Sequence, residues 1–115
     1  MGRVFDPKQE QWKRVERRGA EEVFSHILLP QDPSVSVRLG LTRIDAGSTL
    51  GIHVDDYSHV FCVREGYGQV QLGREKHAIG PGDVITTDIR EPHGLWADEG
   101  ADLILVTANV YPNEP

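Results

Sequence analysis

Four side chains of types that bind metal ions lie in the middle and later parts of the chain. His53 and Asp55 are separated by one residue, His59 follows the segment Asp56-Tyr57-Ser58, and His93 lies 34 residues beyond His59. On a strand, residues two apart point to the same side, so His53 and Asp55 would share a face. Imidazole suits Zn, Cu, Fe and Ni, and a carboxylate shifts the preference toward harder ions. The four residues therefore predict a site for one divalent metal ion: Fe, Zn, Mn or Ni.

Three histidines that leave a coordination position open let a metal polarise or activate whatever binds there. Asp55 is either a fourth ligand or, because its side chain is short, a residue that orients a ligand or a water. The alternative is that the histidines are separate polar residues at strand ends, because spacing alone does not bring His93 to the others. His26 and His77 have no partner at ligand spacing and are expected to be surface or satisfied residues.

Two further residues are candidates for contact with a bound molecule. Arg43 continues the strand face of the alternating apolar residues from Val35 to Leu41, which we interpret as the inward face. A charge there would anchor a substrate carboxylate or phosphate, and the alternative is a rim arginine in a salt bridge. Tyr57 lies between two predicted ligands and would line the mouth of the site or lie in water.

The elements that must position these residues are strands. Residues 1–22 are polar and are predicted to form an arm with no more than one or two helical turns, followed by a single domain over residues 23–115. Period-two alternation from Val35 to Leu41 indicates a strand. Short apolar runs separated by Gly, Pro, Asp and Asn predict further strands near residues 23–29, 47–54, 58–65, 67–72, 75–79, 83–87, 93–98 and 101–110. Many short strands indicate a sandwich or barrel.

Some of these strands are apolar on both sides. Leu50, Ile52 and Val54 alternate with His53, and the strand at 101–110 is apolar on both faces. Such strands must be covered on both sides, either by the arm or by a second subunit. A hairpin of residues 47–54 and 58–65 would place His59 opposite His53.

Length and composition limit the class of protein. A chain of 115 residues with 38% apolar residues fits one globular domain. The net charge of −6 argues against nucleic-acid binding. The single cysteine, Cys62, excludes an intrachain disulfide and fits a buried thiol in a reducing compartment. The sequence shows no signal peptide and no segment of membrane-spanning length, so a cytoplasmic location is expected.

The spacing of these residues resembles the two sequence motifs of the cupin family. The first motif is G, five residues, H-x-H, three or four residues, E, six residues, G. Gly47, His53 and Gly66 match it in register, whereas Asp55 replaces the second histidine and His59 replaces the glutamate.

The second motif is G, five residues, P-x-G, two residues, H, three residues, N. Gly82 and His93 match it, whereas Asp88, Arg90 and Ala97 replace the proline, the second glycine and the asparagine. The resemblance covers about residues 35–110 and includes the tract from Ala78 to Ile85 that precedes this motif.

The resemblance implies an all-β fold, a double-stranded β-helix or jelly-roll barrel, with a metal ion in its mouth. The implied function is a metal-dependent enzyme of dioxygenase, isomerase or lyase type that acts on a small polar molecule. The alternatives are a non-catalytic binder or sensor of a small molecule and a barrel whose metal is only structural. Cupins of this size commonly form homodimers. Six apolar side chains expected to point out of the barrel also favour a homodimer: Leu50, Ile52, Val54, Val60, Cys62 and Trp96.

Overall fold

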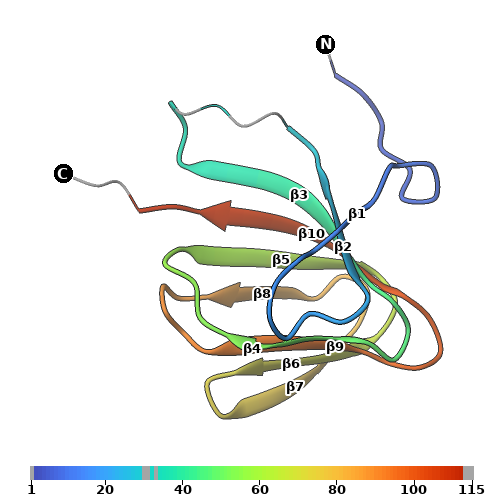
Figure 1. Ribbon diagram of the computed structural model, residues 1–115, viewed down its shortest axis with the longest axis vertical. Coiled ribbons are helices and arrows are strands. Elements are labelled where there is room, and N and C mark those ends of the chain that lie inside the picture. The colour runs from blue at the N-terminus through green and yellow to red at the C-terminus, as the bar shows by residue number, and fades with distance from the viewer. Residues whose placement is uncertain (1, 30–31, 33, 113–115) are drawn as a thin grey trace.

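The computed structural model describes residues 2–29, 32 and 34–112, and within this part of the chain it contains strands and no helix. The strands form two antiparallel sheets that lie one above the other (Figure 1). The six-stranded sheet has the order β1 (Lys13–Arg14), β2 (Val23–Ile27), β3 (Val37–Ile44), β10 (Leu103–Val110), β5 (Ser58–Glu65), β8 (Val84–Thr87). The four-stranded sheet has the order β4 (Thr49–His53), β9 (His93–Ala97), β6 (Gly68–Leu72), β7 (Glu75–Ile79). This is the predicted all-β jelly-roll arrangement.

Two strands, β5 and β7, have the predicted bounds, and most others are shorter than predicted. The strand β3 begins two residues later and ends three residues later than the alternation from Val35 to Leu41. The short β1 was not predicted because its residues are polar. Apolar side chains from both sheets meet between the layers. The core cluster comprises Val23, Ile44, Leu50, Phe61, Val63, Val70, Ile79, Ile85, Leu95, Ala97, Leu103 and Leu105.

The pairing between strands identifies the inward face of the six-stranded sheet. Val23, Ile44 and Leu103 are paired across β2, β3 and β10, and each is 0% exposed. Arg43 alternates with Ile44 and therefore points outward. The prediction that Arg43 and the apolar residues before it face inward is wrong. Both faces of β3 carry apolar residues, so alternation with period two did not reveal which face meets the core.

The strands on either side of Asp55 do not form the expected hairpin. The strand β4 pairs with β9, whereas β5 pairs with β10 and β8, so the intervening loop crosses from one sheet to the other. A register shift between Leu50 and His53 lets both side chains point into the barrel. Leu50 accordingly belongs to the core, and Ile52 is exposed.

The N-terminal arm contacts both sheets (Figure 1). Its β1 pairs with β2, and further along the arm Ala20 bridges to Leu50 in β4. The backbone N–H of Gly51 also donates to the carbonyl of Gly19 at 2.8 Å. This attachment brings arm residues close to the end of β4, where His53 lies.

The two histidines predicted to lie outside the site do so. His26 faces the arm, with Nδ1 3.0 Å from the Gln11 carbonyl and the ring against Trp12. His77 is exposed and lies 3.5 Å from a carboxylate oxygen of Glu75. None of the described residues belongs to a helix long and apolar enough to cross a membrane.

Candidate metal centre

The structure brings the four predicted ligands together inside one end of the barrel. His53 ends β4 and His93 begins β9, and the two are direct cross-strand partners with ring centroids 4.3 Å apart. His59 reaches the same point from β5 in the opposite sheet, with its ring 4.9 Å from that of His93. Asp55 comes from the loop between β4 and β5. The tertiary structure thus supplies the convergence that spacing alone left open.

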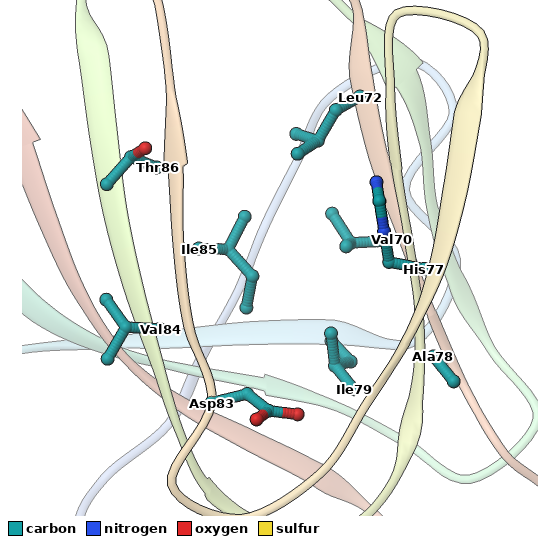
Figure 2. Close-up of a pocket in the computed structure, with 9 residues that line it drawn as sticks. All are labelled: Val70, Leu72, His77, Ala78, Ile79, Asp83, Val84, Ile85 and Thr86. Carbon is teal, nitrogen blue, oxygen red and sulfur yellow. The ribbon is translucent and has the colours of Figure 1, made fainter.

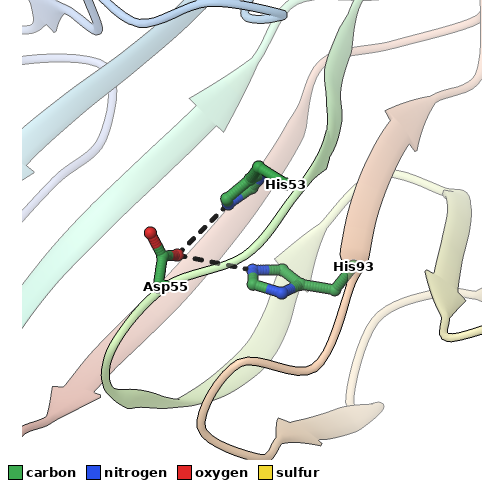
Figure 3. Close-up of side chains that lie close together, drawn as sticks. All are labelled: His53, Asp55 and His93. Atoms are coloured by element: carbon green, nitrogen blue, oxygen red, sulfur yellow. Dashed lines mark ion pairs between the residues drawn. The ribbon is translucent and has the colours of Figure 1, made fainter.

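The carboxylate of Asp55 lies between the three rings. Its Oδ2 atom is 2.8 Å from Nε2 of His59, 3.2 Å from Nε2 of His53 and 3.7 Å from Nε2 of His93. Figure 3 shows His53 and His93 pointing at this carboxylate from two adjacent strands. Within this group, ligand atoms of His53, Asp55 and His93 all lie within 4.8 Å of one another, a set that could hold a metal ion.

In each histidine ring, the hydrogen bond made by Nδ1, on the side away from the centre, determines which nitrogen carries the proton. Nδ1 of His53 lies 2.7 Å from the Gly51 carbonyl, and Nδ1 of His93 lies 2.8 Å from the Glu91 carbonyl. Carbonyl oxygens only accept hydrogen bonds, so these Nδ1 atoms are the donors. His59 makes the equivalent contact at 2.8 Å to Oδ1 of Asn109. In the neutral rings each Nε2 therefore presents a lone pair to the centre, as in metal-bound histidines.

This arrangement requires a positive charge at the centre. Three lone pairs and a carboxylate oxygen repel one another unless a cation lies among them. Nε2 of His93 is buried and has no hydrogen-bond partner among the described residues. Burial lowers the pKa of His93 below its ordinary value, and a proton on His53 or His59 would lower it further. A proton is thus poorly held on His93, and the nitrogen and oxygen donors present fit a divalent metal ion.

Asp55 stays ionised despite its burial. Burial raises the pKa of its carboxyl group, but the contact with His59 and the charge of Arg17 outweigh it, so the pKa lies below its usual range. Nη2 of Arg17 lies 3.2 Å from Oδ1 of Asp55, on the side of the carboxylate away from the rings. Sequence analysis missed Arg17, because nothing in the polar arm indicates that it reaches residue 55.

The loop before His93 is tied to the loop that carries Asp55. The backbone N–H of Arg90 donates to the carbonyl of Asp55 at 2.8 Å, and its side chain forms an ion pair with Asp56. Arg90 has a φ of 63°, in the left-handed region that favours glycine. This is the motif position where glycine was replaced. Arg90 therefore adopts a backbone conformation that suits the glycine it replaces.

The two predicted ligand-contact residues have different surroundings. Tyr57 is half-buried, with its ring centroid 5.0 Å from that of His59 and 4.5 Å from that of Tyr111. Burial raises the pKa of the Tyr57 phenol, and the Asp55 carboxylate adds to this effect. Arg43 instead lies outside the barrel, where its Nε donates to Asp45 at 2.9 Å. The arrangement of Arg43 fits the salt-bridge alternative.

A separate hollow of about 390 Å³ lies where the edge strands β7 and β8 are not paired with each other. Figure 2 shows Ile85 of β8 on one side of it and Val70 and Ile79, from the β6–β7 hairpin, on the other. The four predicted metal ligands do not line this hollow. It is therefore distinct from the metal centre.

Comparison with known proteins identifies the family. The family model described as the cupin domain matches residues 40–109, more than half of the chain. The chain belongs to the cupin family. The match includes His53, His59, His93 and Asp55, and it confirms the resemblance seen in the two motifs. No curated protein sequence matches this cupin.

Solved structures show the same fold. The polyketide cyclase RemF from Streptomyces resistomycificus is 22% identical, with a TM-score of 0.82, over 100% of this cupin and 83% of that chain. A predicted oxalate decarboxylase from Thermotoga maritima is 22% identical, with a TM-score of 0.83, over 96% and 100%. KdgF from Halomonas sp. is 21% identical, with a TM-score of 0.74, over 98% and 97%. At these identities the likeness establishes the jelly-roll fold.

Proposed function

We propose that this cupin is a metal-dependent enzyme that acts on a small polar organic molecule bound in the mouth of the barrel. His53, His59 and His93 would bind one divalent metal ion, with Asp55 beside it. The observation that carries this proposal is the set of three Nε2 atoms directed at one point, each ring fixed through its Nδ1. Nε2 of His93 and Nε2 of His26 are both buried without a hydrogen-bond partner among the described residues. Nε2 of His26 lies 3.2 Å from a Glu10 carboxylate oxygen, whereas the nearest carboxylate oxygen to Nε2 of His93 is 3.7 Å away and is shared with two other histidines.

The residues of the chain suggest how the centre would work. A bound metal would act as a Lewis acid toward a substrate oxygen at its open position. Arg17 holds one oxygen of Asp55, which leaves the other oxygen directed at the histidines. Tyr57 keeps its proton because its pKa is raised, so its hydroxyl can donate a hydrogen bond to a ligand beside His59.

Two of the similar folds are named as enzymes, a polyketide cyclase and a predicted oxalate decarboxylase. Their likeness supports an enzyme over a structural protein. The same fold also suits a non-catalytic binder or sensor, so turnover must be measured directly.

The first experiment measures metal content in protein purified without a chelating column. We expect about one equivalent of a transition metal, lost in His53→Ala and in His93→Ala. His77→Ala is the matched control, because His77 is exposed on β7 and remote from the site. Full metal content in His93→Ala would show that the site is elsewhere.

The second experiment incubates the metal-loaded protein with a panel of small organic acids and carbonyl compounds and follows their masses. We expect consumption of one compound class, abolished by chelation and by His93→Ala and restored when metal is returned to the wild-type protein. If compounds raise the melting temperature but none is consumed, the protein is a binder or sensor and the enzyme proposal fails.

A further inference from the structure

A cavity of about 280 Å³, hereafter the chamber, opens against β2, β3 and β10. Its lining includes Ile27, Leu29, Arg38, Thr42, Thr107 and Asn109. Thr42 is paired with the core residue Leu105, and Thr107 lies two residues beyond Leu105 on the same face of β10. The chamber therefore lies on the inward side of the six-stranded sheet.

The chamber shares a wall with the metal centre. Arg38, Asn109 and His59 are paired in one row across β3, β10 and β5. Adjacent strands lie about 4.8 Å apart, so two strand spacings separate Arg38 from His59. Asn109 lies between them, with its Oδ1 2.8 Å from Nδ1 of His59. A molecule in the chamber would thus have one side next to the residue that holds His59 in place.

The lining combines an apolar rim with a polar floor. Ile27 is 70% exposed and Leu29 is 58% exposed, which leaves two large apolar side chains beside a cavity. Below them, the hydroxyls of Thr42 and Thr107 are hydrogen bonded at 2.9 Å. Gly40 contributes no side chain to this floor. An apolar group placed against Ile27 and Leu29 would remove exposed apolar surface from water.

Arg38 supplies a positive charge at the same opening. Its guanidinium lies 5.3 Å from the ring centroid of Tyr111, and no ion pair among the described residues involves Arg38. Arg17, in contrast, is paired with Asp55. A guanidinium stacked on an aromatic ring keeps its fork of donors available for a planar anion such as a carboxylate. The chain has a net charge of −6, so a guanidinium without an ion-pair partner among the described residues is a candidate binding group for an anionic ligand.

We propose that the chamber binds a small organic acid with one carboxylate and an apolar body. The carboxylate pairs with Arg38, the apolar body contacts Ile27 and Leu29, and the remaining part lies toward Asn109 and His59. The part of this inference that makes the acid a substrate rests on the proposed function. The binding itself does not, because the chamber is formed by residues other than the predicted ligands.

The test compares phenylacetate with its neutral amide, phenylacetamide, by calorimetry and by amide chemical shifts of the full chain, both as purified and after metal removal. We expect phenylacetate to bind in both forms and to shift amides near Ile27, Arg38 and Thr107. Arg38→Gln should weaken phenylacetate about tenfold and leave phenylacetamide unchanged. Arg64→Gln is the matched control, because Arg64 is exposed on the outward face of β5.

Ile27→Ser tests the apolar rim and should weaken both probes, and folding is not at risk because this side chain is mostly exposed. Equal binding of the two probes, or unchanged phenylacetate binding in Arg38→Gln, would overturn the proposal. Phenylacetate binding through Arg38 in a protein that holds no metal and consumes nothing would instead refute only the proposed enzyme. Metal-dependent turnover that is insensitive to Arg38→Gln would refute only the chamber.

Discussion

Asp55 and His59 approach each other through the atoms that face the centre of the site, with Oδ2 and Nε2 2.8 Å apart. The other nitrogen of the same ring is turned to an amide oxygen. A neutral ring in this orientation has no proton to give Asp55, so a proton or a metal ion must lie between them. The contact thus marks where a cation would bind.

Replacement of Asp55 tests whether this residue binds the metal ion directly or only orients a ligand. We predict that Asp55→Ala lowers metal affinity about 10- to 100-fold, the range for a residue that orients a ligand. His93→Ala should remove stoichiometric metal altogether, because it deletes a donor atom. A chelator competition on both variants measures the difference, and equal losses would show that Asp55 binds the metal directly.

Arg90 occupies a backbone conformation that suits glycine, so we predict that Arg90→Gly stabilises the protein. Relief of the left-handed strain is worth roughly 1–2 kcal/mol, offset by about 0.5–1 kcal/mol from the freer unfolded chain. The ion pair lost to Asp56 is exposed and contributes little. Urea unfolding measures the change, and a lower midpoint than in wild type would contradict this account.

Gly66 connects β5 to β6 with a φ of 85°, and a Cβ atom there would lie 2.2 Å from the carbonyl oxygen of Asp102. We predict that Gly66→Ala destabilises the fold by roughly 2–5 kcal/mol through backbone strain and steric overlap. Gly73 has a φ of 58° and open space around it. Gly73→Ala is therefore the control for strain alone, and equal losses of unfolding free energy in the two variants would exclude the overlap.

The homodimer remains a prediction, but its surface changes. Leu50 lies in the core, Ile52 and Val54 are exposed around the end of β4 in one sheet, and Cys62 belongs to the other sheet. The six outward side chains expected from the sequence therefore do not form one patch. The outward face of the six-stranded sheet instead carries exposed apolar residues in three strands: Val37, Val84, Val106 and Val110.

We predict a twofold dimer through this outward face of the six-stranded sheet. Light scattering should give about twice the chain mass of 12.8 kDa. Val106→Lys should shift the protein to monomer, because it places a charge in the middle of the patch. Ile52→Lys, on the other sheet, should leave the dimer intact. A monomer at all concentrations for wild type would remove support for this interface.

The sequence by itself determined the all-β class, most of the strands and the identity of the central ligand candidates. These follow from local rules: period-two alternation, turn residues and the spacing of Gly47, His53, Gly66 and His93. The spacing still identified His93 although Arg90 replaces the glycine of the second motif, and Arg90 itself has a φ of 63°.

Only the tertiary structure decided which faces point inward and which distant residues meet. The face of Arg43 was misjudged because β3 is apolar on both sides, and a register shift in β4 turned Leu50 inward. Arg38 and Asn109 reach the site region through pairing between strands far apart in sequence. Arg17 reaches it because Gly19 and Ala20 of the arm attach to β4. Such contacts depend on the packing of two sheets around one core, which no local pattern encodes.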